Sequence, residues 1–266
     1  MSGAGEVVPE ARRQLAAMMF RVKLNSGPFQ LTGRFFAPDC ASEKPLPALV
    51  YCCGFPGSEV SFRIAKTLSD GGYSVLALNY RGIRESEGEV DFASQVDDVK
   101  AGLTYLENRV EVKRELIGIV GHSAGGALAI LTAAQDLRIK AVAVWGAIGN
   151  YERFLRFLLS THGNIMMRLD GWFGRREYRG RNIMDQMKNF LSQNVSPVDC
   201  VGKISPRPLL IVHEKNDMFV SAQHASDLYE RAGDPKKLVI VKGRTHSVTE
   251  EMIRLTIAWF NSIVTL

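Results

Sequence analysis

The chain has 266 residues, of which 46% are hydrophobic and 23% are charged, and its formal net charge is +5. This composition is that of an ordinary globular protein with enough apolar material for a large core, and it excludes a disordered or fibrous chain. The charge is mildly basic, but no basic run interleaved with aromatic residues is present, so we expect no nucleic-acid partner.

The sequence contains no recognisable targeting signal and no candidate membrane span. Residues 1–13 are polar and lack the apolar segment of a secretory signal, and no uncharged apolar stretch approaches the length of a membrane span. The four cysteines are irregularly spaced and the histidines lack ligand spacing, so we expect neither a disulfide framework nor a metal site. These features predict a reduced, cytoplasmic protein without a membrane span. The oligomeric state is left open.

Strand and helix patterns alternate along the chain. Residues 19–25 and 29–36 flank Ser26-Gly27-Pro28 and predict a β-hairpin. Buried strands are expected at 48–53, 73–80, 116–120, 139–145, 208–213 and 237–241, and helices at 60–69, 91–109, 124–134, 222–232 and 250–264. Apolar strands that alternate with helices predict an α/β fold with a mostly parallel, doubly wound sheet.

The pattern changes between residues 146 and 201, where aromatic residues and arginines are frequent. This segment is too short for a core of its own, so we expect a single domain over 1–266 with a short helical cap insertion at 146–201. The cap aromatics are candidates for substrate binding, among them Phe154, Phe157, Trp172 and Phe173. The sequence equally allows these rings to dock the cap on the core, and the arginines either to bind an anionic substrate group or to be solvated.

The most informative stretch is the apolar run 116–120 followed by Gly121-His122-Ser123-Ala124-Gly125. A small-residue helix pattern follows it directly. Gly-x-Ser-x-Gly between a strand and a helix is typical of a tight turn that holds the serine at its apex, and the two glycines let strand and helix approach closely. We therefore predict that Ser123 is a nucleophile.

A serine hydroxyl needs a base to take its proton and a third group to orient that base. In parallel sheets such groups lie on loops at the carboxyl ends of strands. His246 follows the last predicted strand, and Asp217 follows the strand before it. Glu214 lies closer to that strand end and is the competing acid. We favour Asp217, because Asp-x-x-Val before a helix also supplies the turn that aims the carboxylate.

The other histidines have less suitable positions. His122 occupies the variable position of the elbow motif, where we expect it to shape the pocket wall. We expect His162 on the surface of the cap, His213 within or at the end of a strand, and His224 on a helix.

A tetrahedral intermediate needs hydrogen-bond donors for its oxyanion. We expect one from the main-chain N–H of Ala124, directly after the nucleophile. The turn Gly54-Phe55-Pro56-Gly57 offers the N–H of Phe55 as the second.

Taken together, these motifs resemble the α/β-hydrolase superfamily, and within it the small serine esterases of the cinnamoyl/feruloyl-esterase and dienelactone-hydrolase-like groups. The residues that carry the resemblance are Cys53-Gly54-Phe55-Pro56-Gly57, Asn79-Tyr80-Arg81-Gly82 with Ser86-Glu87-Gly88, the Ser123 elbow, Asp217-Met218-Phe219-Val220 and His246. Two positions depart from the pattern: Cys53 stands where many relatives have histidine, and Arg84 where they often have glycine. The resemblance implies a small-molecule ester or thioester substrate and no cofactor.

The sequence thus predicts a serine carboxylesterase that cleaves small or medium acyl esters through an acyl-enzyme. An acyl-CoA or carrier thioesterase, or a peptidase-like amidase, would use the same apparatus, because the triad does not encode the leaving group. A non-catalytic binding protein on a hydrolase fold is the least favoured alternative, since no triad member is missing.

Overall fold

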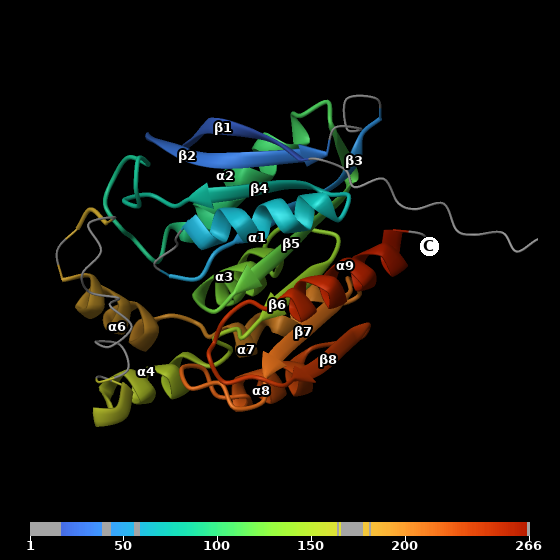
Figure 1. The fold of residues 1–266 in the computed structure, drawn as a ribbon. Coiled ribbons are helices and arrows are strands. Elements are labelled where there is room, and N and C mark those ends of the chain that lie inside the picture. Colours follow the sequence, from blue (N-terminus) through green and yellow to red (C-terminus); the bar gives the residue numbers. More distant parts are fainter. Residues whose placement is uncertain are drawn as a thin grey trace, which may run out of the picture.

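The computed structural model describes residues 17–38, 44–55, 59–163, 165, 178–180 and 182–264. Within these residues, eight strands form one sheet in the order β1-β2-β4-β3-β5-β6-β7-β8 (Figure 1). The strands are β1 Ala17–Ser26, β2 Phe29–Pro38, β3 Leu46–Cys52, β4 Ser74–Asn79, β5 Val112–His122, β6 Val142–Trp145, β7 Leu209–Glu214 and β8 Lys236–Val241.

The sheet is antiparallel at one edge and parallel elsewhere. The predicted hairpin is present, because β1 pairs antiparallel with β2, and β2 then pairs antiparallel with β4. From β4 through β3 to β8, every neighbouring pair is parallel. The mostly parallel, doubly wound sheet that the strand and helix pattern predicted is therefore confirmed.

Helices cover both faces of the sheet. The helices are α1 Glu59–Asp70, α2 Gln95–Glu107, α3 Ala124–Ala133, α4 Tyr151–Leu159, α6 Ile183–Gln193, α7 Pro197–Cys200, α8 Gln223–Arg231 and α9 Glu250–Val264. Helices α1 and α9 pack against each other on one face, while α2, α3, α7 and α8 contact one another in sequence on the other. Helices α4 and α6 lie beyond the end of the sheet toward which the arrow of β4 points (Figure 1).

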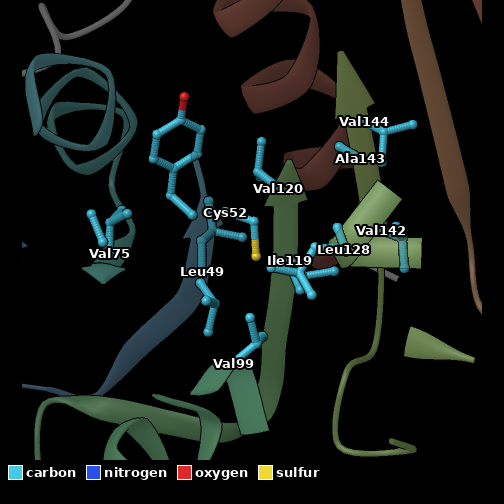
Figure 2. Close-up of a cluster of buried hydrophobic side chains, with 14 of the residues drawn as sticks. Leu49, Cys52, Val75, Val99, Ile119, Val120, Leu128, Val142, Ala143 and Val144 are labelled. Carbon is cyan, nitrogen blue, oxygen red and sulfur yellow. The ribbon is translucent and has the colours of Figure 1, made fainter. Parts of the chain in front are cut away.

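Coverage on both faces explains why several strands of the sheet are buried along their whole length. Every residue of β4, β6 and β7 is buried, whereas β1 at the edge exposes most of its first half. Figure 2 shows part of this core, with Leu49, Ile119 and Val142 projecting from three neighbouring strands. The core fixes the strand ends from which the functional loops extend.

Strand β6 begins at Val142 rather than at 139, and two further elements begin four residues away from their predicted positions. Strand β5 begins at Val112 rather than at 116, because Leu46 of β3 pairs with Val112 beyond a register shift. Helix α2 begins at Gln95 rather than at 91. Asp91 there accepts the main-chain N–H of Ala93 at 3.1 Å, and this local turn competes with helix formation. Among the described residues, no helix combines the length and the apolar character needed to cross a membrane.

Candidate active site

Ser123 lies at the apex of the turn between β5 and α3, with φ 57° and ψ −122°. A side chain at Gly121 would place its Cβ 2.2 Å from the carbonyl oxygen of Gly125, and one at Gly125 would place it 2.2 Å from that of Cys52. Only glycine fits at these two positions. The two glycines therefore permit this turn, which holds a strained serine that is only 3% exposed.

Three side chains from distant parts of the chain form a continuous hydrogen-bond chain. His246 Nε2 lies 2.8 Å from Ser123 Oγ, and His246 Nδ1 lies 2.5 Å from Asp217 Oδ2. Ser123 follows β5, Asp217 follows β7 and His246 follows β8. These strands are parallel, so their carboxyl ends meet at one edge of the sheet. The tertiary structure thus brings together the three residues that the sequence analysis selected.

The carboxylate of Asp217 is held by its own turn. Its Oδ1 accepts the main-chain N–H groups of Phe219 and Val220, each at 2.9 Å, which leaves Oδ2 for His246. Burial by itself would raise the pKa of this carboxyl. The hydrogen bonds from His246 and from the two amides outweigh burial and hold the pKa below its usual range. Asp217 is thus kept ionised, as a carboxylate that orients a histidine must be.

The backbone of His246 is fixed from both sides. Its φ is +59°, a conformation that is costly for a residue with a Cβ. Glu214 Oε2 accepts its main-chain N–H at 2.7 Å, and its carbonyl oxygen lies 3.1 Å from His122 Nε2. Since a carbonyl can only accept, His122 donates here through Nε2–H. Glu214 therefore contacts the backbone of His246, whereas Asp217 contacts its ring.

His122 packs against the imidazole of His246, with the ring centroids 4.8 Å apart. Burial, reinforced by the neighbouring His246, lowers the pKa of His122 to about 3. The ring is thus neutral at physiological pH and adds no positive charge beside His246. The sequence analysis expected His122 to shape the pocket wall, and the structure places it as a support for the His246 loop.

Two further residues adjoin the triad, Gly146, which the sequence analysis did not name, and His213, which it expected within or at the end of a strand and which lies in β7. Gly146 directly follows β6 with φ +50°, and a Cβ there would lie 3.2 Å from His246 Cε1. His213 is fully buried, and its Nε2 donates to the carbonyl oxygen of Val220 at 2.7 Å, which steadies the Asp217 turn. The available signal for Gly146 was a glycine directly after a predicted strand.

The segments that carry the two predicted oxyanion donors pass beside the nucleophile. Ala124 is the first residue of α3, so its N–H has no acceptor within the helix and lies at the positive end of the helix dipole. A Cβ at Gly54 would lie 3.2 Å from Ser123 Cβ, so the turn that carries Phe55 passes next to the serine. The ring of Phe55 is held by Tyr178, with centroids 5.1 Å apart.

An apolar groove of about 270 Å³ begins beside Ala124. We call it the α3 groove, and its walls come from α2, α3, α4 and α6. Its lining residues include Ala124, Ala127, Leu128, Leu131, Tyr151, Phe154, Met187, Phe190 and Leu191. Of the predicted substrate-binding residues, Phe154 lines the groove. Phe157 stacks on Phe154 with centroids 6.0 Å apart and is not part of the lining. Trp172 and Phe173 fall outside the described residues.

Within the described part of the chain, no group of three or more histidine, cysteine, aspartate or glutamate side chains is arranged to hold a metal ion.

Solved structures with the same arrangement of elements include that of the α/β hydrolase GrgF from Penicillium sp. sh18. The two structures superpose with a TM-score of 0.74 at 20% identity, over 94% of this chain and 100% of GrgF. The chain has the α/β-hydrolase fold. Another structure with this fold, the esterase Pf2001 of Pyrococcus furiosus, gives a TM-score of 0.74 at 15% identity over 97% of this chain and 95% of Pf2001. The predicted resemblance to the α/β-hydrolase superfamily is thus confirmed at the level of the fold.

Sequence comparisons agree with the α/β-hydrolase fold. The family model BD-FAE matches residues 52–152, a stretch that includes the Ser123 elbow. The polyketide transferase grgF from Penicillium sp. is 26% identical over 239 residues, which cover 75% of this chain and 81% of grgF. The uncharacterized protein YfhR of Escherichia coli O157:H7 is 24% identical over 208 residues, or 77% of this chain. The match covers 64% of YfhR, so the chain spans less than two thirds of that relative.

Proposed function

We propose that this chain is a serine hydrolase, a carboxylesterase that cleaves small or medium acyl esters through an acyl-enzyme. The hydrogen-bond chain from Ser123 through His246 to Asp217, with links of 2.8 and 2.5 Å, is the observation that carries the proposal. We also propose that the chain is a single domain and that residues 146–201 act as a cap over this site.

In the first half of the reaction, Ser123 Oγ attacks the ester carbonyl carbon while His246 Nε2 takes the hydroxyl proton. Asp217 stabilises the imidazolium that forms. The bond from the carbonyl carbon to the leaving oxygen then breaks, and His246 returns the proton to that oxygen. The alcohol departs and the acyl group stays on Ser123.

In the second half, water replaces the alcohol. His246 takes a proton from the water, the oxygen attacks the acyl carbon, and the bond to Ser123 Oγ breaks as the proton returns to the serine. In both halves the main-chain N–H groups of Ala124 and Phe55 would stabilise the oxyanion. Removal of one such donor typically costs about 10²–10³ in kcat.

A fluorophosphonate probe together with p-nitrophenyl acetate tests this proposal. We expect the wild type to be labelled and to hydrolyse the ester, and Ser123→Ala to lose both properties. Ser262→Ala, which changes an exposed serine in the last turn of α9, is the matched control. A wild type that is neither labelled nor active, although folded by circular dichroism, would refute the proposal.

Acyl transfer to an acceptor other than water is the second candidate function. The relative grgF is described as a polyketide transferase, and it matches this chain in both sequence and structure. The acyl-enzyme is the same, and only the second nucleophile differs. Product analysis with an added alcohol or amine separates the two: a transferase forms the new ester or amide in preference to the free acid.

A further inference from the structure

The α3 groove is apolar over most of its length. Its lining side chains Leu128, Tyr151, Phe154 and Leu191 are each at most 6% exposed, because they lie between packed helices. Apolar walls with few polar groups are suited to a hydrocarbon ligand. Ala124, which directly follows the nucleophile, belongs to the same lining, so such a ligand would reach the reacting carbon.

The groove follows one face of α3. Its lining residues Ala124, Ala127, Leu128 and Leu131 are spaced by three and four positions, so they share one side of the helix. A helix rises 1.5 Å per residue, so Leu131 lies about 10 Å along the groove from Ala124. An extended chain advances about 1.2 Å per bond, so this distance accommodates about eight or nine bonds.

The far end of the groove reaches the surface. Gln135 and Val195 belong to its lining, and both side chains are exposed, Val195 to 62%. Gln135 Oε1 accepts a hydrogen bond from Lys100 Nζ at 3.0 Å, which marks the polar rim. A chain longer than the apolar section would therefore pass out of the groove and would not be blocked by a wall.

The position of His246 decides which part of an ester enters the groove. The leaving oxygen must come within reach of His246 Nε2 to receive its proton. His246 does not belong to the lining of the α3 groove, and neither does Phe219, which packs on its ring with centroids 5.7 Å apart. The leaving alcohol thus belongs on the His246 side of Ser123, and the acyl chain on the side of Ala124 and α3.

We propose that the α3 groove binds a linear, medium-chain acyl group of about eight to ten carbons, and that Ala127 and Leu131 determine how much of the chain is bound. This inference rests on the proposed esterase function and adds the class of acyl group. Neither a compact acyl group such as acetyl nor a strongly polar one would use the apolar walls.

The first test is a series of p-nitrophenyl esters from acetate to dodecanoate, assayed as monomers. Burial of one methylene is worth a factor of about four, so kcat/KM should rise by about that factor per added carbon up to about C8 to C10 and then level off. The plateau follows from the open far end. A flat series, or one that declines from acetate, overturns the proposal.

The second test introduces a bulky side chain at two different positions along the groove. In Ala127→Phe the rise in kcat/KM should stop near C4, and in Leu131→Trp about two carbons short of the wild-type plateau, because the two positions lie about 4.5 and 10 Å from Ala124 and the larger rings extend into the groove. Leu137→Trp, at an exposed leucine beyond the end of α3, should leave the length at which the rise stops unchanged. Identical profiles in all three variants would contradict the assignment.

Direct binding separates failure of the groove from failure of the chemistry. Ser123→Ala should bind decanoate at least tenfold more tightly than butyrate by calorimetry, whether or not the enzyme turns over. Labelling of the wild type by the fluorophosphonate, and its hydrolysis of p-nitrophenyl acetate, test the triad and not the groove. An active enzyme without a preference for decanoate overturns the groove proposal and leaves the esterase proposal standing. Tight decanoate binding by an unreactive protein supports the groove proposal and overturns the esterase proposal.

Discussion

Glu214 accepts a hydrogen bond from the main-chain N–H of His246 at 2.7 Å and makes none with its imidazole. Asp217, three residues later, contacts the imidazole at Nδ1. The two carboxylates therefore hold the same histidine in two different ways, and substitution of each should have a different effect.

For Glu214 we expect the loss of the acceptor to matter more than the loss of the charge. Glu214→Gln keeps an oxygen that can accept the N–H of His246, so kcat/KM should stay within about tenfold of the wild type. Glu214→Ala leaves a partly buried N–H without this acceptor and should lower the free energy of unfolding by about 1–3 kcal/mol, with a larger loss of activity. Denaturant unfolding and ester hydrolysis measure the two effects. Equal effects of both substitutions would argue against this role.

For Asp217 we expect the loss of the charge to matter more than the loss of a hydrogen-bond acceptor. Asp217→Asn keeps the size of the side chain but cannot stabilise the imidazolium and favours the wrong tautomer of His246, so kcat should fall by about 10³-fold or more. KM should change little, because the carboxylate lies behind the ring and not in the substrate groove. Steady-state kinetics on p-nitrophenyl acetate measure this. A smaller loss than in Glu214→Gln would mean that the two acids have been assigned the wrong way round.

Gly146 provides a test of packing against the catalytic ring. Gly146→Ala introduces a Cβ 3.2 Å from His246 Cε1 at a position whose φ is +50°. Because this Cβ would displace the imidazole ring, kcat should fall at least about tenfold. Gly27→Ala is the matched control. Its φ is +57°, but a Cβ there meets nothing within 4 Å. Both variants should lose about 1–2 kcal/mol of stability to backbone strain, and only Gly146→Ala should lose activity.

The buried histidines predict acid sensitivity of the fold. Burial lowers the pKa of His122 and of His224 to about 3, whereas the unfolded chain titrates near pH 6.5. Between these values the unfolded state binds protons that the folded state does not. The free energy of unfolding should therefore fall as the pH falls from about 6.5 to 3, by up to about 1.4 kcal/mol per pH unit for each histidine. Above pH 6.5 both states are neutral and the two residues contribute no pH dependence.

His224→Asn tests this dependence without altering the triad. The amide oxygen of asparagine can still accept the main-chain N–H of Asn150, which His224 Nδ1 now accepts at 3.1 Å. Urea unfolding at pH 7 and pH 5 should give a smaller difference in the variant than in the wild type. An unchanged difference would show that His224 does not stay neutral in the folded protein.

Local patterns in the sequence were sufficient to predict the parallel sheet, the hairpin and the turn at Ser123. Each of these depends on neighbours along the chain: apolar runs make buried strands, and the spacing of Gly121 and Gly125 allows the close approach of β5 and α3. The chain order of Ser123, Asp217 and His246 also followed from the sequence, because each comes soon after a predicted strand.

Only the tertiary structure decided which atoms meet. Glu214 and Asp217 are three residues apart and both follow β7, so the sequence left a choice that the path of the 243–247 loop settles in space. The support of His246 by His122 and the contact with Gly146 join residues about one hundred or more positions apart along the chain. Such contacts depend on how separate loops pack at the sheet edge, and a one-dimensional pattern does not record that geometry.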